Sequence, residues 1–308
     1  MTRARRRADL SERKKISTNS RKNRQEDEGR TMSYGAKTWR QFKKSRSAVI
    51  GLVVVAFLLF VALFANRVAP YDPLKVNYDK LMHPPSREHI MGTDWIGRDV
   101  LSRMIAGSRL SLSVGFISVG IGLVCGTILG LAAAFYRKLD NVIMRFIDIL
   151  MAFPSTLLCI AVVAMLGPSL QNAMIAVGVT GIPGYTRMVR GTALSVRSTD
   201  YVEAARAIGV RDLRIMIRHM FPNMLAPLLV MITFGLASAV LSAAGLSFLG
   251  LGAQPPEPEW GLMISEGRHY MLKAPWLVLG PGIIVTILIL GVNLLGDGMR
   301  DALDPRLH

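Results

Sequence analysis

The side chains that most often carry chemistry are sparse in this chain of 308 residues and stand apart from one another. Four of the five histidines fall in expected loops or at the terminus, without an HExxH pattern: His83, His89, His269 and His308. Cys125 and Cys159 lie inside apolar runs and have no partner at metal-ligand spacing. Because no Ser/His/Asp spacing stands out either, we predict no catalytic residue and no metal site.

One polar stretch in the second half of the chain has residue types suited to docking. Asp200 and Glu203 stand three residues apart, as in the capping box that starts a helix. Alanines follow at positions that favour a helix, and Gly209 is a natural residue to end it. We predict that a second helix starts at Asp212 and stops before Pro222.

The predicted unit is a helix–glycine–helix elbow, residues 199–223, whose first helix has a low surface of alanines. A short helix of this shape fits a cleft on a partner, and Glu203 and Arg206 offer charged contacts. The chain lacks the GxxxxGK[ST] pattern, so it does not hold ATP phosphates with a Walker A loop. If ATP powers this protein, a partner subunit must bind the nucleotide.

The composition indicates which kind of element positions the elbow. Hydrophobic residues make up 51% of the chain and charged residues 19%, whereas soluble domains carry about 25% charge. The net charge is +16, and residues 1–46 hold 16 basic and 5 acidic residues. Since the excess charge sits in a tail, a compact nucleic-acid-binding domain is disfavoured. We predict a disordered basic tail over residues 1–32, with Met32 as an alternative start, and one transmembrane domain over 33–308.

Five tracts without charged residues are long enough to span a membrane, because a helix needs about 20 apolar residues to cross a core of about 30 Å. They cover residues 47–66, 110–136, 149–186, 220–256 and 274–296. The third tract is too long for one helix and contains a Gly-Pro turn signal, so we divide it. The sequence therefore predicts an all-α integral membrane protein with six transmembrane helices, near 48–65, 110–135, 144–166, 170–187, 224–249 and 276–296.

The distribution of Lys and Arg predicts the orientation of these helices. With the N-terminus inside, the inner segments hold 28 basic residues and the outer segments hold 9. Cytoplasmic loops carry the excess of basic residues in membrane proteins. We therefore predict that both termini are cytoplasmic, that residues 66–109 form an outer loop, and that residues 188–223 form a cytoplasmic loop.

Small residues predict where the helices pack and where a pathway could run. A stripe of small residues recurs every four positions in the second predicted helix: Ser118, Gly122, Gly126, Gly130 and Ala134. Such stripes let helix backbones approach closely, and we favour packing within the chain over a dimer interface. The fourth predicted helix contains Gly178, Gly181, Pro183 and Gly184, so it is a candidate for the translocation path, with a merely kinked helix as the alternative. We also expect Arg145 and Asp148, on one face of the third helix, to pair.

The elbow carries the residues of a known motif. Its sequence resembles the EAA motif of ABC importer permeases at Glu203, Ala204, Ala205, Arg206, Gly209, Pro222 and Asn223, with His219 at a position that is often aliphatic in the family. Segments 92–109, 247–261 and 296–305 resemble the outer and C-terminal segments of the C-type permease in the dipeptide/oligopeptide/nickel branch. The resemblance covers roughly residues 33–306.

The resemblance implies the type I permease fold of ABC importers and a bacterial inner-membrane location. It implies a heterodimer with a second permease subunit, two ATPase subunits that bind ATP and magnesium, and an extracytoplasmic solute-binding protein. The elbow would be the coupling helix that docks on the ATPase, and this chain would be non-catalytic and bind no cofactor. Peptides are the expected solute, with nickel chelates, glutathione or another small solute as alternatives; no substrate-binding residue is identified.

Two other classes of protein remain to be weighed. An independent secondary carrier or channel would work without ATPase subunits, but the spans lack the buried charges typical of ion coupling. A membrane-tethered nucleic-acid-binding protein would use the basic tail, which shows no recognisable fold. We expect a lipid bilayer around the helices and no nucleic-acid partner.

Overall fold

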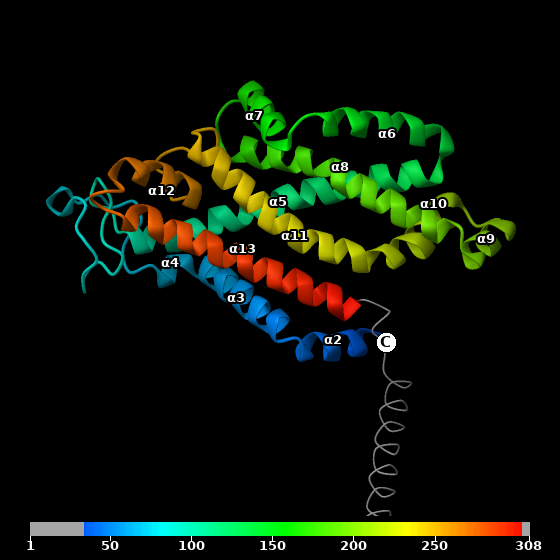
Figure 1. The fold of residues 1–308 in the computed structure, drawn as a ribbon, viewed down its shortest axis with the longest axis horizontal. Helices are drawn as coiled ribbons and strands as arrows, with labels where there is room; N and C mark the ends of the chain where they lie inside the picture. The colour runs from blue at the N-terminus through cyan, green and yellow to red at the C-terminus, as the bar shows by residue number, and fades with distance from the viewer. Residues whose placement is uncertain (1–33, 304–308) are drawn as a thin grey trace, which may run out of the picture.

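The computed structural model describes the backbone of residues 34–303 and the side chains of residues 39–303 apart from His219. The predicted tail over 1–32 and the alternative start at Met32 lie outside the described residues. Within them the fold is helical (Figure 1). The α-helices are α2 Tyr34–Lys44, α3 Arg46–Leu63, α4 Ala65–Val68, α5 Val100–Phe135, α6 Arg137–Ala152, α7 Ser155–Leu166, α8 Leu170–Arg197, α9 Asp200–Ala207, α10 Asp212–Ile215, α11 Phe221–Phe248, α12 Trp260–Gly267 and α13 Trp276–Leu303.

Four of the described helices are long and apolar enough to cross a membrane: α3, α5, α11 and α13. A fifth span results if the bent pair of α6 and α7 is one span. Helix α8 has 28 residues but a more polar composition. The predicted count of six spans therefore stays a prediction, as does the cytoplasmic side of the termini.

The helix predicted over 110–135 begins ten residues earlier, at Val100. Asp99 is its N-cap, and the Asp99 carboxylate accepts a hydrogen bond from the backbone N–H of Ser102 at 2.8 Å. The prediction placed the start after Arg109 because it treated charged residues as limits of a helix. A cap residue marks the true start, since it satisfies the unpaired N–H groups of the first turn.

The single helix predicted over 144–166 was wrong, because the structure divides it into α6 and α7 with a bend of 94°. The break lies at Phe153 and Pro154, which have extended backbone angles. Proline lacks an N–H and disfavours helical geometry in the residue before it, which explains the break. Asp148 of α6 pairs with Arg187 of α8 at 2.5 Å, so the expected pair with Arg145 was also wrong.

The stripe of small residues on α5 packs against α8, as we favoured. Ser118, Gly122, Gly126, Gly130 and Ala134 are all buried. A Cβ added at Gly126 would lie 2.5 Å from the Cβ of Tyr185, and one at Gly130 would lie 2.7 Å from the carbonyl oxygen of Thr186. Both helices therefore need glycine to approach this closely.

The irregular segment before α5 lies next to α12 at one end of the molecule (Figure 1). Four charged residues lie together there, and we name them the outer cluster after the predicted outer loop: Asp94, Arg98, Arg103 and Glu266. Nε of Arg98 lies 2.6 Å from Asp94, and Nη2 of Arg103 lies 3.1 Å from Glu266. The two arginines are 3% and 1% exposed, so this end of the predicted outer loop is packed, whereas most of residues 66–90 are exposed or half-buried.

Glu259 is the N-cap of α12 in the same region. Its carboxylate accepts hydrogen bonds from the backbone N–H groups of Gly261 at 3.0 Å and Leu262 at 2.9 Å, and from the hydroxyl of Ser111 at 3.2 Å. Burial raises the pKa of Glu259, and these hydrogen bonds partly offset that effect. The contact with Ser111 joins α12 to α5.

The two ends of the described chain lie together. Phe42 of α2, Ala48 of α3 and Ala302 of α13 form one small buried cluster. A Cβ at Gly298 would lie 2.1 Å from the Cβ of Ala48, so α13 packs closely on the start of α3. Helix α13 runs from the α12 end of the molecule to α2 (Figure 1).

Candidate functional site

The elbow projects at the end of the molecule opposite α12 (Figure 1). Its first helix, α9, begins at Asp200 as predicted, but no side chain caps it. Thr199 is the N-cap residue, and its hydroxyl donates to the carbonyl of Val196 at 2.6 Å. The expected capping box is therefore not formed, although the helix is.

Gly209 ends α9 in the way the sequence predicts. Its φ is +77°, a left-handed conformation that glycine adopts without steric cost. Its N–H bonds to the carbonyl of Arg206 at 2.9 Å, and the N–H of Val210 bonds to the carbonyl of Ala205 at 3.1 Å. This pair of bonds is a Schellman motif. A Cβ at Gly209 would meet no atom within 4 Å, so only the backbone conformation requires glycine.

The second helix of the elbow differs from the prediction. It begins at Asp212, but it does not stop before Pro222. Instead, α10 passes through a π-helical segment, Met216–Met220, directly into α11. Pro222 lacks the N–H that an α-helix would pair with the carbonyl of Arg218. The π-helical segment, which is wider than an α-helix, ends two residues before Pro222. The elbow is therefore continuous with α11. His219 lies in the π segment, and its side chain is outside the described residues.

Helix α9 has a buried face and an exposed face. Val202 and Ala205 are buried against the rest of the chain, whereas Glu203 and Ala204 are exposed. Two large apolar side chains that the sequence analysis missed extend the exposed face: Ile208 is 81% exposed and Leu213 is 63% exposed. They flank the Gly209 turn, and apolar residues on both sides of an exposed turn were the signal that could have identified them.

Side-chain contacts attach the elbow to the helices behind it. The guanidinium of Arg206 lies 4.7 Å from the centre of the Phe135 ring at the end of α5. Next to the elbow, Arg197 at the end of α8 donates to the carbonyl of Ala134 at 2.8 Å, which joins α8 to α5. The amide of Asn223 donates to the hydroxyl of Tyr201 at 3.1 Å, which joins α11 to α9. Arg206, predicted as a docking contact, therefore contacts α5 of its own chain.

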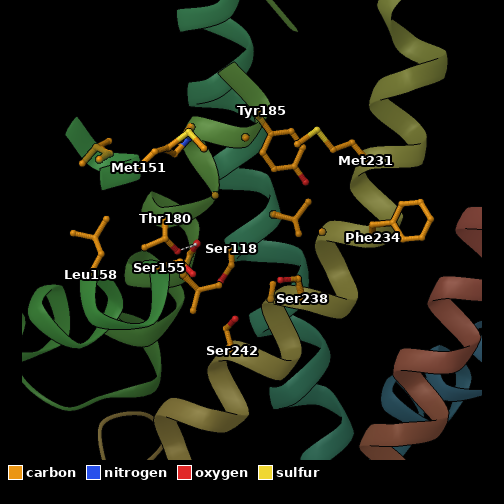
Figure 2. Close-up of a pocket in the computed structure, with 18 of the residues that line it drawn as sticks. Ser118, Met151, Ser155, Leu158, Thr180, Tyr185, Met231, Phe234, Ser238 and Ser242 are labelled. Atoms are coloured by element: carbon orange, nitrogen blue, oxygen red, sulfur yellow. Dashed lines mark hydrogen bonds between the residues drawn. The ribbon is translucent and has the colours of Figure 1, made fainter. Parts of the chain in front are cut away.

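A cavity of about 480 Å³ lies between α5, α8, α11 and the break between α6 and α7 (Figure 2). From α8 its lining includes Gly181, Pro183 and Gly184, three of the four residues that made this helix a candidate for the translocation path, whereas Gly178 does not line it. The other lining residues are apolar or carry hydroxyl groups, and none of those described carries a charge. Helices α5, α8 and α11 line the cavity and also contact the elbow, so movement of one has a direct structural route to the other.

The sequence of the chain matches known families over most of its length. Residues 122–308 match the binding-protein-dependent transport system inner membrane component, and residues 33–85 match the N-terminal TM domain of oligopeptide transport permease C. The chain belongs to this family of inner-membrane transport components. It is accordingly a multi-pass protein of the inner membrane.

Individual relatives agree with the family match. The chain is 45% identical to the dipeptide transport system permease protein DppC of Alkalihalophilus pseudofirmus, covering 92% of this chain and 93% of that one. It is 43% identical to the glutathione transport system permease protein GsiD of Pectobacterium atrosepticum, covering 87% and 90%.

The fold resembles that of a solved importer. An inward-facing structure of the MetNI methionine ABC transporter superposes with a TM-score of 0.55 at 21% identity, covering 66% of this chain and 96% of that one. The predicted type I permease fold is therefore confirmed, and the two alternatives, an independent carrier and a tethered nucleic-acid-binding protein, do not fit this family.

Proposed function

We propose that this chain is the transmembrane permease subunit of an ATP-driven importer of di- and oligopeptides. The observation that carries the proposal is the 45% identity to a dipeptide permease over nearly the full length of both chains. The exposed elbow, at the end of the molecule away from α12, supports it.

The proposed importer needs partner subunits for the functions that this chain does not perform. A second permease subunit would complete the pathway, two ATPase subunits would bind and hydrolyse ATP with magnesium, and an extracytoplasmic binding protein would deliver the solute. This chain would be non-catalytic, bind no cofactor of its own and have no nucleic-acid partner.

The elbow would couple ATP hydrolysis to transport. Glu203, Ala204, Ile208 and Leu213 would contact the ATPase, because they form the exposed surface around the turn. Arg206 on Phe135 would pass the movement to α5, and the unbroken helix from Asp212 would pass it to α11. Since both helices line the cavity, closure of the ATPases would change access to it.

Glutathione is a second candidate solute, favoured by the 43% identical glutathione permease. Glutathione is itself a modified tripeptide, so the two candidates share the peptide group. Nickel chelates are the other expected alternative, and no observation favours them specifically.

Uptake of labelled Ala-Ala in cells that lack this chain tests the proposal. Wild-type protein should restore uptake, whereas Glu203→Arg and Gly209→Val should lower it at least tenfold at equal abundance in the membrane. Glu203→Arg reverses a charge on the docking surface, and Gly209→Val imposes a left-handed conformation on a β-branched residue.

Gly191→Val is the matched control, because Gly191 of α8 is exposed, has an ordinary helical φ and has open space around it. It should support normal uptake. Normal uptake by both elbow variants would contradict the coupling role, and a wild-type protein that assembles with its ATPases without restoring Ala-Ala uptake would contradict the peptide assignment.

A further inference from the structure

The cavity contains a polar group that the fold itself leaves without a partner. The hydroxyl of Tyr185 is buried and makes no hydrogen bond to any described residue. Tyr185 as a whole is only 4% exposed. A buried hydroxyl without a partner destabilises a protein by about 1–3 kcal/mol, so its retention calls for an explanation outside the fold.

The surroundings of Tyr185 hold this hydroxyl at the cavity. Its ring packs on the glycine stripe of α5, where a Cβ at Gly122 would lie 3.2 Å from it. Its hydroxyl reaches α11, where a Cβ at Gly235 would lie 2.4 Å from the oxygen. Figure 2 shows the ring between α8 and α11, with the hydroxyl directed toward α11 on the side where Ser238 lies. Glycines on two helices therefore make room for a tyrosine whose hydroxyl makes no hydrogen bond to the described residues.

Other hydroxyl groups surround the same space. Ser118 and Thr180 line the cavity while donating to the backbone carbonyls of Met174 and Val177, at 2.9 Å each. These two hydroxyls keep free acceptor lone pairs. Ser155, Ser238 and Ser242 also line the cavity, and Ser155 and Ser238 are exposed.

This lining selects a chemical class of ligand. Uncharged hydroxyl groups both donate and accept hydrogen bonds, which matches the N–H and C=O of an amide. The described lining offers no ion-pair partner, so it would contact the peptide group and not the charged termini of a dipeptide, and it has no carboxylate, imidazole or thiolate for a metal. A volume of about 480 Å³ lies within the range of small-molecule sites.

We propose that the cavity is a binding site for the peptide groups of the transported solute and that the Tyr185 hydroxyl bonds to an amide of that solute during passage. The proposal rests on the peptide-importer function proposed above and adds the residue and the contact. Apolar lining residues such as Met231 and Phe234 would accommodate side chains without selecting among them.

The first test measures Ala-Ala uptake by the complete importer in proteoliposomes, with the Ala-Ala-loaded binding protein as the varied reactant. Tyr185→Phe should lower the kcat of uptake about fivefold to tenfold, as expected for the loss of one hydrogen bond, and leave the KM for the loaded binding protein unchanged. Its Tm should equal or exceed that of the wild type, because the substitution removes an unpaired buried hydroxyl. Tyr78→Phe, at an exposed tyrosine outside the cavity, is the matched control and should change nothing.

A second test does not depend on Tyr185. Ser238→Cys should react with a small neutral thiol reagent that blocks transport, and saturating Ala-Ala should protect it. Leu241→Cys is the control and should not be protected, because Leu241 is exposed on α11 but does not line the cavity.

The outcomes separate this proposal from the importer function. If the wild type transports Ala-Ala and Tyr185→Phe transports it equally well, or if peptide does not protect the cysteine at position 238, the cavity assignment is overturned while the importer function stands. If the wild type transports no Ala-Ala, the importer function fails and the assignment fails with it.

Discussion

Charged residues are buried against one another at the α12 end of the molecule, whereas at the elbow they are exposed or stacked on an aromatic ring. In the outer cluster, Arg98 and Arg103 are almost fully buried between the carboxylates of Asp94 and Glu266. In the elbow, Glu203 is exposed and Arg206 lies over Phe135. Buried ion pairs fix one geometry, because a partner that moves away leaves an uncompensated charge. In the elbow, removal of one charge leaves no buried charge without a partner.

Removal of one charge should therefore have the largest effect in the outer cluster. Asp94→Ala leaves two buried arginines with Glu266 as their remaining carboxylate partner, which should destabilise the protein by about 3–5 kcal/mol. We expect little protein in the membrane and a lower Tm after purification. Asp79→Ala, at an exposed residue of the same outer segment, is the control, and equal Tm values for the two variants would contradict the comparison.

The elbow should show the opposite behaviour, with coupling affected more than stability. Arg206→Ala should lower the Tm only slightly and lower peptide-stimulated ATPase activity about twofold to fivefold, since an exposed cation–π contact contributes about 0.5–1 kcal/mol. Arg206→Lys should retain part of the activity.

A double-mutant cycle sharpens this prediction. Phe135→Leu combined with Arg206→Ala should cost no more activity than the larger of the two single effects, because both remove the same contact. Additive losses would indicate that Arg206 acts elsewhere, for instance in direct docking on the ATPase.

The smallest effect concerns the protonation of the outer cluster. Burial raises the pKa of the Glu266 carboxyl above its usual 4.5, and the nearby Arg103 and Arg98 only partly offset this effect. The folded state thus holds the proton more tightly than the unfolded state. The contribution to stability is fully present below pH 4.5 and is lost as the pH rises through the raised pKa.

Glu266→Gln removes this dependence. As the pH rises from 4.5 to 7.5, the Tm of the wild type should therefore fall relative to the Tm of Glu266→Gln. Glu88→Gln is the contrasting variant: a hydrogen bond from Lys80 lowers the pKa of the exposed Glu88, so any trend should be weak and of opposite sign. A pH-independent difference for Glu266→Gln would contradict the assignment.

Local sequence signals correctly predicted the features that depend on the conformation or size of a single residue type. Gly209 ends α9 because glycine adopts a positive φ, and the glycines of α5 allow close packing because they lack a Cβ. Both depend on residue type and spacing alone. The π segment before Pro222 and the break at Pro154 involve the same local chemistry, but whether a proline bends, breaks or is absorbed by a helix depends on the neighbouring helices.

The sequence by itself determined the class of protein: long apolar helices, a short elbow of two helices and the motif that accompanies them. These follow from hydrophobicity, helix propensity and capping, which act within a few residues. Only the tertiary structure decided which charges are buried together, since Asp94 and Glu266 are far apart in the chain. It also decided that Arg206 faces Phe135 and that Tyr185 places an unpaired hydroxyl at a cavity, because contacts and burial depend on how distant helices pack.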